Sequence, residues 1–340
     1  MKILITGGCG FVGSNVALGL SHEHKVFCLD NLSKNESKLN KVLLQKNAIK
    51  VIEGNISDEK FINNLIADLK PNFIIHLAAQ VAMSSSIENP INDFNINLLG
   101  TFNLLNSIKK HSINTKFLNI STNKVYGDLL WDKLKEEEKR YTSLKFVNGY
   151  DEMTPISFSG PYGCSKGSAE QYVIDYSNTF NLQTTSLRLS TIYGPNQYAT
   201  FNQGWIGWFL SEINFQKNKN KVELSIHGNG KQVRDILYID DFTKLIIFIL
   251  SDFDKFNGQV FNVGGSKNQS ISILELFDKS KNIFDISKEF KVHKKNWRVA
   301  DQRFYISDIS KIKKFSGWVP ETNLDSGLEK FSNWIIKNSK

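Results

Sequence analysis

A tyrosine and a lysine lie four residues apart in the segment Tyr162-Gly-Cys-Ser-Lys166. In a helix this spacing places both side chains on one face, one turn apart. A free tyrosine has a pKa of about 10 and is a poor base at neutral pH. A neighbouring ammonium group, and any further positive charge close by, would stabilise the phenolate and lower that pKa. The pair therefore indicates a base that takes the proton of an alcohol while hydride leaves the same carbon.

A threonine hydroxyl is expected beside this pair. Ser121 and Thr122 follow Phe117–Ile120, an apolar run that predicts a buried strand. Open α/β sheets bind ligands at the carboxyl ends of their strands, so Thr122 would share the proton with Tyr162 through a short hydrogen bond. Taken singly, the Tyr–Lys pair also suits an amphipathic surface helix, and Thr122 suits a strand cap. The three together favour catalysis.

A glycine-rich turn follows the first apolar run of the chain, Ile3–Thr6. Glycines at positions 7, 10 and 13 permit a tight turn, the approach of a pyrophosphate and close packing of helix on sheet. The helix expected over Phe11–Ser21 would direct its unpaired N–H groups at the phosphates. A glycine pattern alone also fits an ordinary turn, but a strand before it and a helix after it predict a dinucleotide site.

An acidic residue at the end of the second expected strand indicates which dinucleotide binds. Asp30 lies seventeen residues after Gly13, near the place of a carboxylate that accepts hydrogen bonds from the adenosine ribose. A carboxylate there repels a 2′-phosphate, which favours NAD over NADP. Lys34 lies close by and leaves NADP open as the alternative.

Short apolar runs alternate with helix-like stretches through the first half of the chain. This order is typical of a parallel sheet with crossover helices. The expected strands are Ile3–Thr6, Val26–Asp30, Ile49–Glu53, Phe73–Leu77 and Phe117–Ile120, with Thr184–Leu189 and Gln259–Val263 as further candidates, and the expected helices are Phe11–Ser21, Asp58–Leu69 and about 89–111.

We therefore predict an α/β protein, a Rossmann-type doubly wound parallel sheet with a smaller, mostly C-terminal α+β substrate lobe. The NAD-binding domain is expected over residues 1–190, with returns at about 232–264. The substrate lobe is expected over 191–231 and 265–340. The charged and aromatic stretch 129–158 is expected to be a surface excursion.

Composition narrows the remaining classes. The 340 residues contain 41% hydrophobic and 22% charged residues, with no apolar run long enough to span a membrane and no signal-like N-terminus, so we expect a cytoplasmic protein. The three cysteines (9, 28 and 164) and six histidines show no metal-ligand spacing, which predicts free thiols and no metal site. The net charge of +8 is scattered rather than gathered in a stripe, which argues against nucleic acid and suits a diphosphate substrate.

The order of motifs over nearly the whole chain resembles the nucleotide-sugar epimerase/dehydratase family of extended short-chain dehydrogenases/reductases. The motifs are Gly7-x-x-Gly10-x-x-Gly13, Leu77-Ala78-Ala79, Asn97, Ser121-Thr122, Tyr162-x-x-x-Lys166, Arg188 with Tyr193-Gly194-Pro195, and Val233-Arg234-Asp235. Within the family, longer phrases resemble the epimerases that act on carbon 2 of the CDP-3,6-dideoxyhexoses CDP-paratose and CDP-tyvelose. Those phrases begin at Ser121, Asn148, Pro161, Gly204, Gly228 and Asp301.

The resemblance implies a role for each matched residue. Thr122, Tyr162 and Lys166 would be catalytic, and Lys166 would also hold the nicotinamide ribose. Arg234 and Arg298 would grip the diphosphate, which suits the forked guanidinium, while Gln80, Val81, Asn123 and Lys124 would line the sugar pocket. Asn55 stands where relatives usually carry aspartate near the adenine, although its carbonyl can still accept. The implied cofactor site comprises Gly7, Gly10, Phe11, Val12, Gly13, Asp30, Asn31, Asn55, Ile56, Leu77, Ala78, Ala79, Asn97, Tyr162 and Lys166.

The resemblance also bears on the reaction. Sugar 4,6-dehydratases of this family carry an Asp-Glu pair directly after the threonine, where this chain has Asn123 and Lys124, so epimerisation is favoured. In a 3,6-dideoxyhexose, a ketone at carbon 4 would not acidify the hydrogen on carbon 2, which points to direct oxidation at carbon 2. The alternatives are a UDP-sugar 4-epimerase and a non-catalytic dinucleotide- or RNA-binding relative. Helices at about 89–111 and 161–180 resemble those that pair subunits in the family and imply a homodimer or homotetramer.

Overall fold

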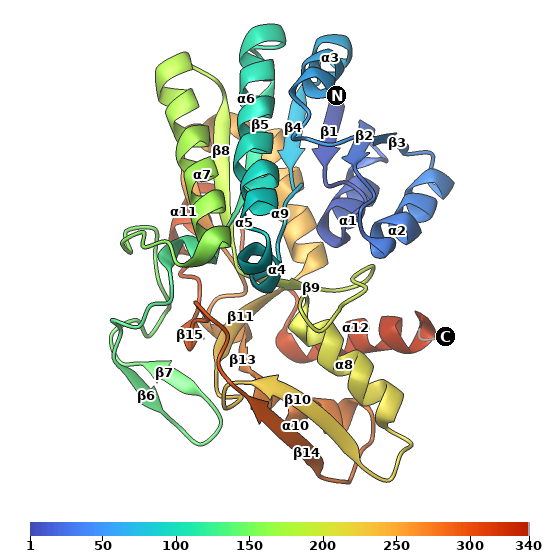
Figure 1. Ribbon diagram of the computed structural model, residues 1–340, viewed down its shortest axis with the longest axis vertical. Coiled ribbons are helices and arrows are strands. Elements are labelled where there is room, and N and C mark those ends of the chain that lie inside the picture. The colour runs from blue at the N-terminus through green and yellow to red at the C-terminus, as the bar shows by residue number, and fades with distance from the viewer. Residues whose placement is uncertain (339–340) are drawn as a thin grey trace.

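A seven-stranded parallel sheet forms the centre of the first lobe. A computed structural model describes residues 1–338, and Figure 1 shows the sheet in its upper half. The strand order is β3-β2-β1-β4-β5-β8-β12, so the order reverses between β1 and β4 and leaves a crevice at the strands' carboxyl ends. This confirms the predicted Rossmann-type sheet, including both candidate strands. The bounds are β1 (Lys2–Thr6), β2 (Lys25–Asp30), β3 (Lys50–Glu53), β4 (Phe73–His76), β5 (Lys116–Thr122), β8 (Thr184–Leu189) and β12 (Val260–Val263).

Helices cover both faces of this sheet (Figure 1). On one face, α3 (Glu59–Leu69), α6 (Gly100–His111) and α7 (Gly160–Phe180) bury apolar side chains such as Ile66, Leu104 and Val173. On the other face lie α1 (Phe11–Leu20), α2 (Asn35–Lys46), α9 (Ile239–Ser251) and α11 (Ser310–Ser316). No helix among residues 1–338 is both long enough and apolar enough to cross a bilayer.

The helix expected over residues 89–111 is broken into separate pieces. It consists of α5 (Pro90–Phe94), the π-helical turn η1 (Asn95–Leu99) and α6, and a short α4 (Met83–Glu88) precedes them. Asn89 caps α5 by accepting a hydrogen bond from the N–H of Asn92. A π-helical turn inserts an extra residue, shifts the side chains that follow and is frequent near functional sites.

The second lobe lies below the carboxyl ends of the main sheet (Figure 1). Its strand β11 (Val233–Tyr238) pairs with β9 (Thr191–Tyr193), β13 (Ser270–Ser272) and β15 (Phe304–Tyr305), while β10 (Val222–His227) pairs with β14 (Phe290–Lys295). Helices α8 (Trp205–Gln216), α10 (Ile273–Ile283) and α12 (Leu324–Asn338) pack on these strands around an apolar core. Short 3₁₀ turns occur at η2 (Asn123–Tyr126), η3 (Phe253–Lys255) and η4 (Lys267–Gln269).

Three segments differ from the sequence expectations. The stretch 129–158 forms the hairpin β6 (Leu134–Glu136) and β7 (Tyr141–Ser143), and its Tyr150 is fully buried in an aromatic cluster rather than at the surface. Helix α11 packs its Ile312 into the core of the first lobe, although 265–340 was assigned to the second lobe. Strand β11 joins the small sheet rather than returning to the main one. In each case long-range packing decides the placement.

Candidate active site

A cavity of about 520 Å³ lies at the carboxyl ends of the main strands and reaches into the second lobe. It brings together residues from the turn after β1 and from α1, β2, β5, α7 and β11, which are far apart in the sequence. Of the expected site residues, those on its wall are Gly7, Gly10, Phe11, Val12, Gly13, Asp30, Asn31, Asn55, Ile56, Leu77, Ala78, Ala79, Val81, Thr122, Asn123, Lys124, Tyr162, Lys166, Arg234 and Arg298.

Gln80 and Asn97 are the two expected residues that do not line this cavity. The Asn97 side chain instead holds the backbone of Gln80 from behind. The N–H of Gln80 donates to Asn97 Oδ1 at 2.9 Å, and Asn97 Nδ2 donates to the Gln80 carbonyl at 3.0 Å. The Gln80 amide folds onto the backbone of Ala82. Both residues therefore shape the cavity wall rather than form it.

The amino terminus of α1 forms one end of the cavity. Its N-cap, Gly10, has no side chain to satisfy the first N–H groups of the helix, so these stay free to bind an anion. Gly7 has a φ of +67°, and a Cβ on Gly13 would lie 2.3 Å from the Gly7 carbonyl oxygen. Both positions therefore require glycine, and the turn matches the geometry that admits a pyrophosphate.

The carboxylate of Asp30 is fixed at the rim of this end. It accepts hydrogen bonds from the N–H groups of Cys9 at 3.0 Å and Leu32 at 2.9 Å. Burial raises the pKa of Asp30, and these hydrogen bonds lower it. Lys34 donates to Gln203 Oε1 at 2.6 Å, so its ammonium is occupied by a residue of the second lobe. The Oδ1 atom of Asn55 accepts from the N–H of Ser57, so its carbonyl serves the local turn.

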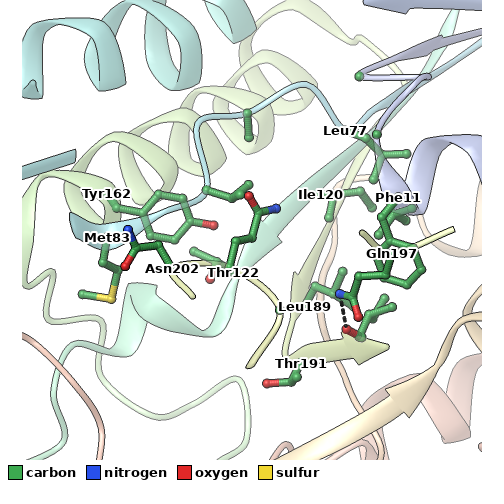
Figure 2. A pocket seen from close by; sticks show the side chains of 18 of the residues that line it. Phe11, Leu77, Met83, Ile120, Thr122, Tyr162, Leu189, Thr191, Gln197 and Asn202 are labelled. Atoms are coloured by element: carbon green, nitrogen blue, oxygen red, sulfur yellow. Dashed lines mark hydrogen bonds between the residues drawn. The ribbon is translucent and has the colours of Figure 1, made fainter. Parts of the chain in front are cut away.

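Thr122, Tyr162 and Lys166 meet at the middle of the cavity. Figure 2 shows the Tyr162 ring and the Thr122 side chain directed at the same space, one from α7 and the other from the end of β5. A side-chain hydrogen bond links them and lowers the pKa of Tyr162. The Lys166 ammonium donates to the Ile120 carbonyl at 2.5 Å. The three residues therefore have the proximity that the sequence predicted.

The electrostatics of the pair differ from the sequence expectation. Burial raises the pKa of Tyr162 to about 12 and outweighs the hydrogen bond from Thr122. Burial also lowers the pKa of Lys166 to about 8. The expected lowering of the tyrosine pKa by its lysine neighbour is thus not seen in the chain alone. The reason is that desolvation favours the neutral form of both groups.

A cationic corner occupies the second-lobe end of the cavity. Arg234 donates to Asp301 Oδ1 at 2.7 Å, and the Lys124 ammonium lies 3.6 Å from the same oxygen. Burial alone would raise the pKa of Asp301, but the charges of Arg234, Lys124 and Arg298 lower it. Three cations therefore face one carboxylate, which leaves a net positive charge for an anionic group.

Several wall residues were missed by the sequence reasoning. Asp301 carried a signal, since it begins one of the phrases of the family resemblance, but it was assigned no role. The same holds for Gln302, which follows Asp301 and is buried behind the wall. Gln302 accepts from Asn123 Nδ2 at 3.0 Å and donates to the Gly127 carbonyl at 2.8 Å, which fixes the turn after Thr122. The others are supplied by loops without a motif or by aromatic stretches, and include Thr191, Gln197, Phe201, Trp205, Trp208 and His227.

Comparison with known proteins agrees with this geometry. Residues 4–331 match the family described as GDP-mannose 4,6 dehydratase. The chain is 42% identical over 336 residues to the CDP-paratose 2-epimerase of Salmonella typhi, a match that covers 98% of this chain and 99% of that protein. The chain belongs to the NAD-dependent nucleotide-sugar epimerase/dehydratase family.

Solved structures of this family superpose on the whole chain. The UDP-glucose 4-epimerase of Thermotoga maritima, solved with UDP-glucose, is 29% identical, covers 100% of both chains and has a TM-score of 0.84. The dTDP-glucose 4,6-dehydratase of Bacillus anthracis, solved in complex with NAD, is 26% identical with a TM-score of 0.80, and the match covers 100% of this chain and 97% of that one. Epimerases and dehydratases thus share this fold, so the residues inside the cavity must separate the two reactions.

Within residues 1–338, the carboxylates on the cavity wall are Asp30 and Asp301. Asp30 is at the dinucleotide end, and Asp301 is paired with Arg234 and Lys124. Elimination of water from a sugar needs an acid and a base beside the redox centre. The positions directly after Thr122 hold Asn123 and Lys124, so neither of these two carboxylates stands there.

Proposed function

We propose that this chain uses NAD to invert carbon 2 of a CDP-3,6-dideoxyhexose and so interconverts CDP-paratose and CDP-tyvelose. The observation that carries the proposal is the 42% identity to a CDP-paratose 2-epimerase over almost the full length of both proteins. The cavity supports it independently, because it contains a Thr–Tyr–Lys set, and its described wall carboxylates are Asp30 at the dinucleotide end and Asp301, which is paired with Arg234 and Lys124.

The residues on the wall fit NAD. The free N–H groups at the start of α1 suit its pyrophosphate, Asp30 suits the adenosine ribose, and Lys166 suits the nicotinamide ribose. Bound there, NAD supplies a reversible hydride acceptor beside Tyr162. The positive charge of its oxidised ring also favours the tyrosine phenolate, which burial alone disfavours.

The chain's own groups would handle the proton. The Tyr162 oxygen takes the proton of the carbon-2 hydroxyl as hydride leaves that carbon, and it returns the proton when hydride comes back to the opposite face. Thr122 shares this proton through its hydrogen bond to Tyr162. Between the two steps the 2-keto sugar must rotate so that its opposite face is presented to the nicotinamide. Arg234, Arg298 and Lys124 would keep the diphosphate bound during this rotation. NAD is regenerated in every cycle.

A substrate with deuterium on carbon 2 tests this reaction. NAD-loaded protein is incubated with [2-²H]CDP-paratose in ordinary water, and the product is followed by NMR. We expect CDP-tyvelose that keeps its deuterium at carbon 2, with no accumulation of NADH. Loss of the label to solvent would contradict direct oxidation at carbon 2, and steady NADH release would indicate a dehydrogenase.

A UDP-sugar 4-epimerase is the second candidate, favoured by the 29% identical structure that contains UDP-glucose. The same assay decides between the two when UDP-glucose is offered in parallel. Inversion of carbon 4 in UDP-glucose, together with inactivity on CDP-paratose, would replace the proposed function by this alternative.

A further inference from the structure

A buried carboxylate lies outside the cavity, directly behind the catalytic helix. Asp93 is at the end of α5, its side chain is 0% exposed, and it precedes the π-helical turn η1. Its Oδ2 atom accepts a 2.5 Å hydrogen bond from the hydroxyl of Ser165, which lies between Tyr162 and Lys166 on α7. Its Oδ1 atom accepts from Asn97 Nδ2 at 3.0 Å. Each oxygen is thus an acceptor, as in an ionised carboxylate.

The same network reaches the wall of the cavity. The Asn97 side chain forms two hydrogen bonds with the backbone of Gln80. Its amide nitrogen also lies 3.1 Å from the Ser165 hydroxyl. The hydroxyl of Ser165 also approaches the Tyr162 carbonyl at 3.3 Å. Asp93 and Asn97 therefore tie two parts of the site to each other, the catalytic turn of α7 and the segment at Gln80 behind the cavity wall.

The charge of Asp93 is not balanced by a direct ion pair among the described residues. The other carboxylate near Lys166 is Glu170, which is already held by Arg188 at 2.7 Å. His76, on β4, also faces Lys166, but burial lowers the pKa of this histidine to about 3 and leaves it neutral. Burying an unpaired carboxylate is costly, and Lys166 is the cation whose charge acts on Asp93, so the Lys166 ammonium is the expected counter-charge.

We propose that Asp93 is a positioning residue for the reaction, which fixes the catalytic turn of α7 against the cavity wall and supplies the counter-charge of the Tyr162–Lys166 pair. This inference rests on the proposed redox role of that pair, and it holds for inversion at any sugar carbon. It gives Asp93 a function beyond packing and explains why a carboxylate stands there in place of an apolar residue.

The sign of the electrostatic effect follows from the charge. A nearby carboxylate raises the pKa of both Tyr162 and Lys166, because it favours the protonated form of each group. Replacing it by a neutral amide removes that effect. Activity requires an ionised tyrosine and a protonated lysine, so both limbs of the pH–rate profile should move to lower pH in Asp93→Asn. Thr122 and Glu170, which also act on these two groups, remain in place.

The experiment compares the pH profiles of turnover for wild type, Asp93→Asn, Ser165→Ala and a control, Asp241→Asn. Asp241 is equally buried, lies on α9 away from the cavity and accepts a hydrogen bond from the N–H of Thr322. We expect both limbs of Asp93→Asn to shift down by about half a unit to one unit. Ser165→Ala should lower kcat with unmoved limbs, because it loosens α7 but keeps the charge. Asp241→Asn should keep the wild-type profile.

A second measurement needs no sugar substrate. In NAD-loaded protein with ¹³C-labelled lysine, the titration of Lys166 is followed by NMR and assigned with Lys166→Met. A lower titration midpoint of Lys166 in Asp93→Asn supports the proposal, whether or not CDP-paratose is turned over. Absence of turnover would refute only the proposed substrate. If Asp93→Asn folds and leaves both limbs of the pH–rate profile and the Lys166 midpoint unchanged, the proposed role of Asp93 is overturned. If Asp93→Asn does not fold, Asp93→Ser takes its place.

Discussion

At the scale of single residues, Tyr162 and Lys166 show how one environment acts oppositely on an acid and a base. Both side chains are buried, and burial raises the pKa of the phenol and lowers that of the ammonium. The resting tyrosine is therefore protonated and becomes a base only where positive charge is added. In the proposed mechanism, this couples proton removal to the presence of an oxidised nicotinamide, so Tyr162 would stay protonated until NAD binds.

Removal of the Tyr162 hydroxyl tests this assignment. Tyr162→Phe should lower kcat by about 10²–10⁴-fold, the usual contribution of a positioned acid–base group. Tm should stay close to wild type, because the ring and its packing are kept. Tyr172→Phe is the matched control, since Tyr172 lies on the same helix with its side chain partly exposed and away from the cavity. Near-normal turnover in Tyr162→Phe would remove the residue from the mechanism.

At the scale of elements, α7 is held to the sheet by a buried ion pair. Glu170 on α7 accepts from the Nε and Nη2 atoms of Arg188 on β8, and Arg188 also donates to the Tyr126 hydroxyl at 2.9 Å. The pair lies one turn beyond Lys166. It therefore fixes the depth of the catalytic helix against the strand whose neighbour, β5, carries Thr122.

Breaking this pair should be costly. Glu170→Gln leaves the Arg188 charge buried without its partner, so the free energy of unfolding should fall by about 3–5 kcal/mol, as measured by urea denaturation. The double variant Glu170→Gln, Arg188→Met should recover part of that loss. Glu321→Gln, which breaks the exposed pair of Glu321 with Lys244, should cost less than about 1 kcal/mol. Equal losses of unfolding free energy in Glu170→Gln and Glu321→Gln would contradict the conclusion that the buried pair holds α7 to the sheet.

The elements also show what the sequence could predict. The glycine turn and the strands of the main sheet were predicted correctly because each has a strong local pattern, whereas α7 was expected from the family resemblance. Helix α2 was missed because its mostly polar sequence buries Leu44 as its main apolar anchor. The break at η1 depends on side-chain bonds of Asn97 to distant residues, which local periodicity does not report. Asp93 and Asp301 gain their significance only from partners far along the chain.

At the scale of the whole molecule, the two lobes are joined across the cavity by polar contacts. Asn15 of α1 donates to the Pro195 carbonyl at 2.9 Å, and Asn40 of α2 donates to the Asn196 carbonyl. With the Lys34–Gln203 contact, these bonds tie the loop after β9 to the dinucleotide side. That loop also supplies Phe201, whose carbonyl accepts from Arg298 at 3.0 Å. The loop thus contacts both the expected cofactor side and the expected diphosphate side.

The outer surface formed by α4, α5 and α7 carries exposed apolar side chains. Ile91 is 73% exposed and Phe94 is 50% exposed, both on α5, and Ile87 on α4 and Tyr172 on α7 are also exposed. Clustered exposed apolar residues are typical of interaction surfaces. Family resemblance implies that subunits pair through the helices at about 89–111 and 161–180, which include α5 and α7. In a two-fold symmetric dimer, each residue at the interface would be buried once in each subunit.

Charge placed on this surface should therefore separate subunits. We predict that the wild-type chain sediments as a dimer or tetramer, and that Ile91→Glu shifts it toward monomer at micromolar concentration, because two carboxylates would be buried per interface. Met153→Glu is the control: Met153 is 86% exposed but lies in the 129–158 segment. The double substitution Ile91→Glu, Phe94→Glu should complete the shift. A wild-type chain that is monomeric, or variants that sediment as the wild type does, would place the subunit contact elsewhere or exclude it.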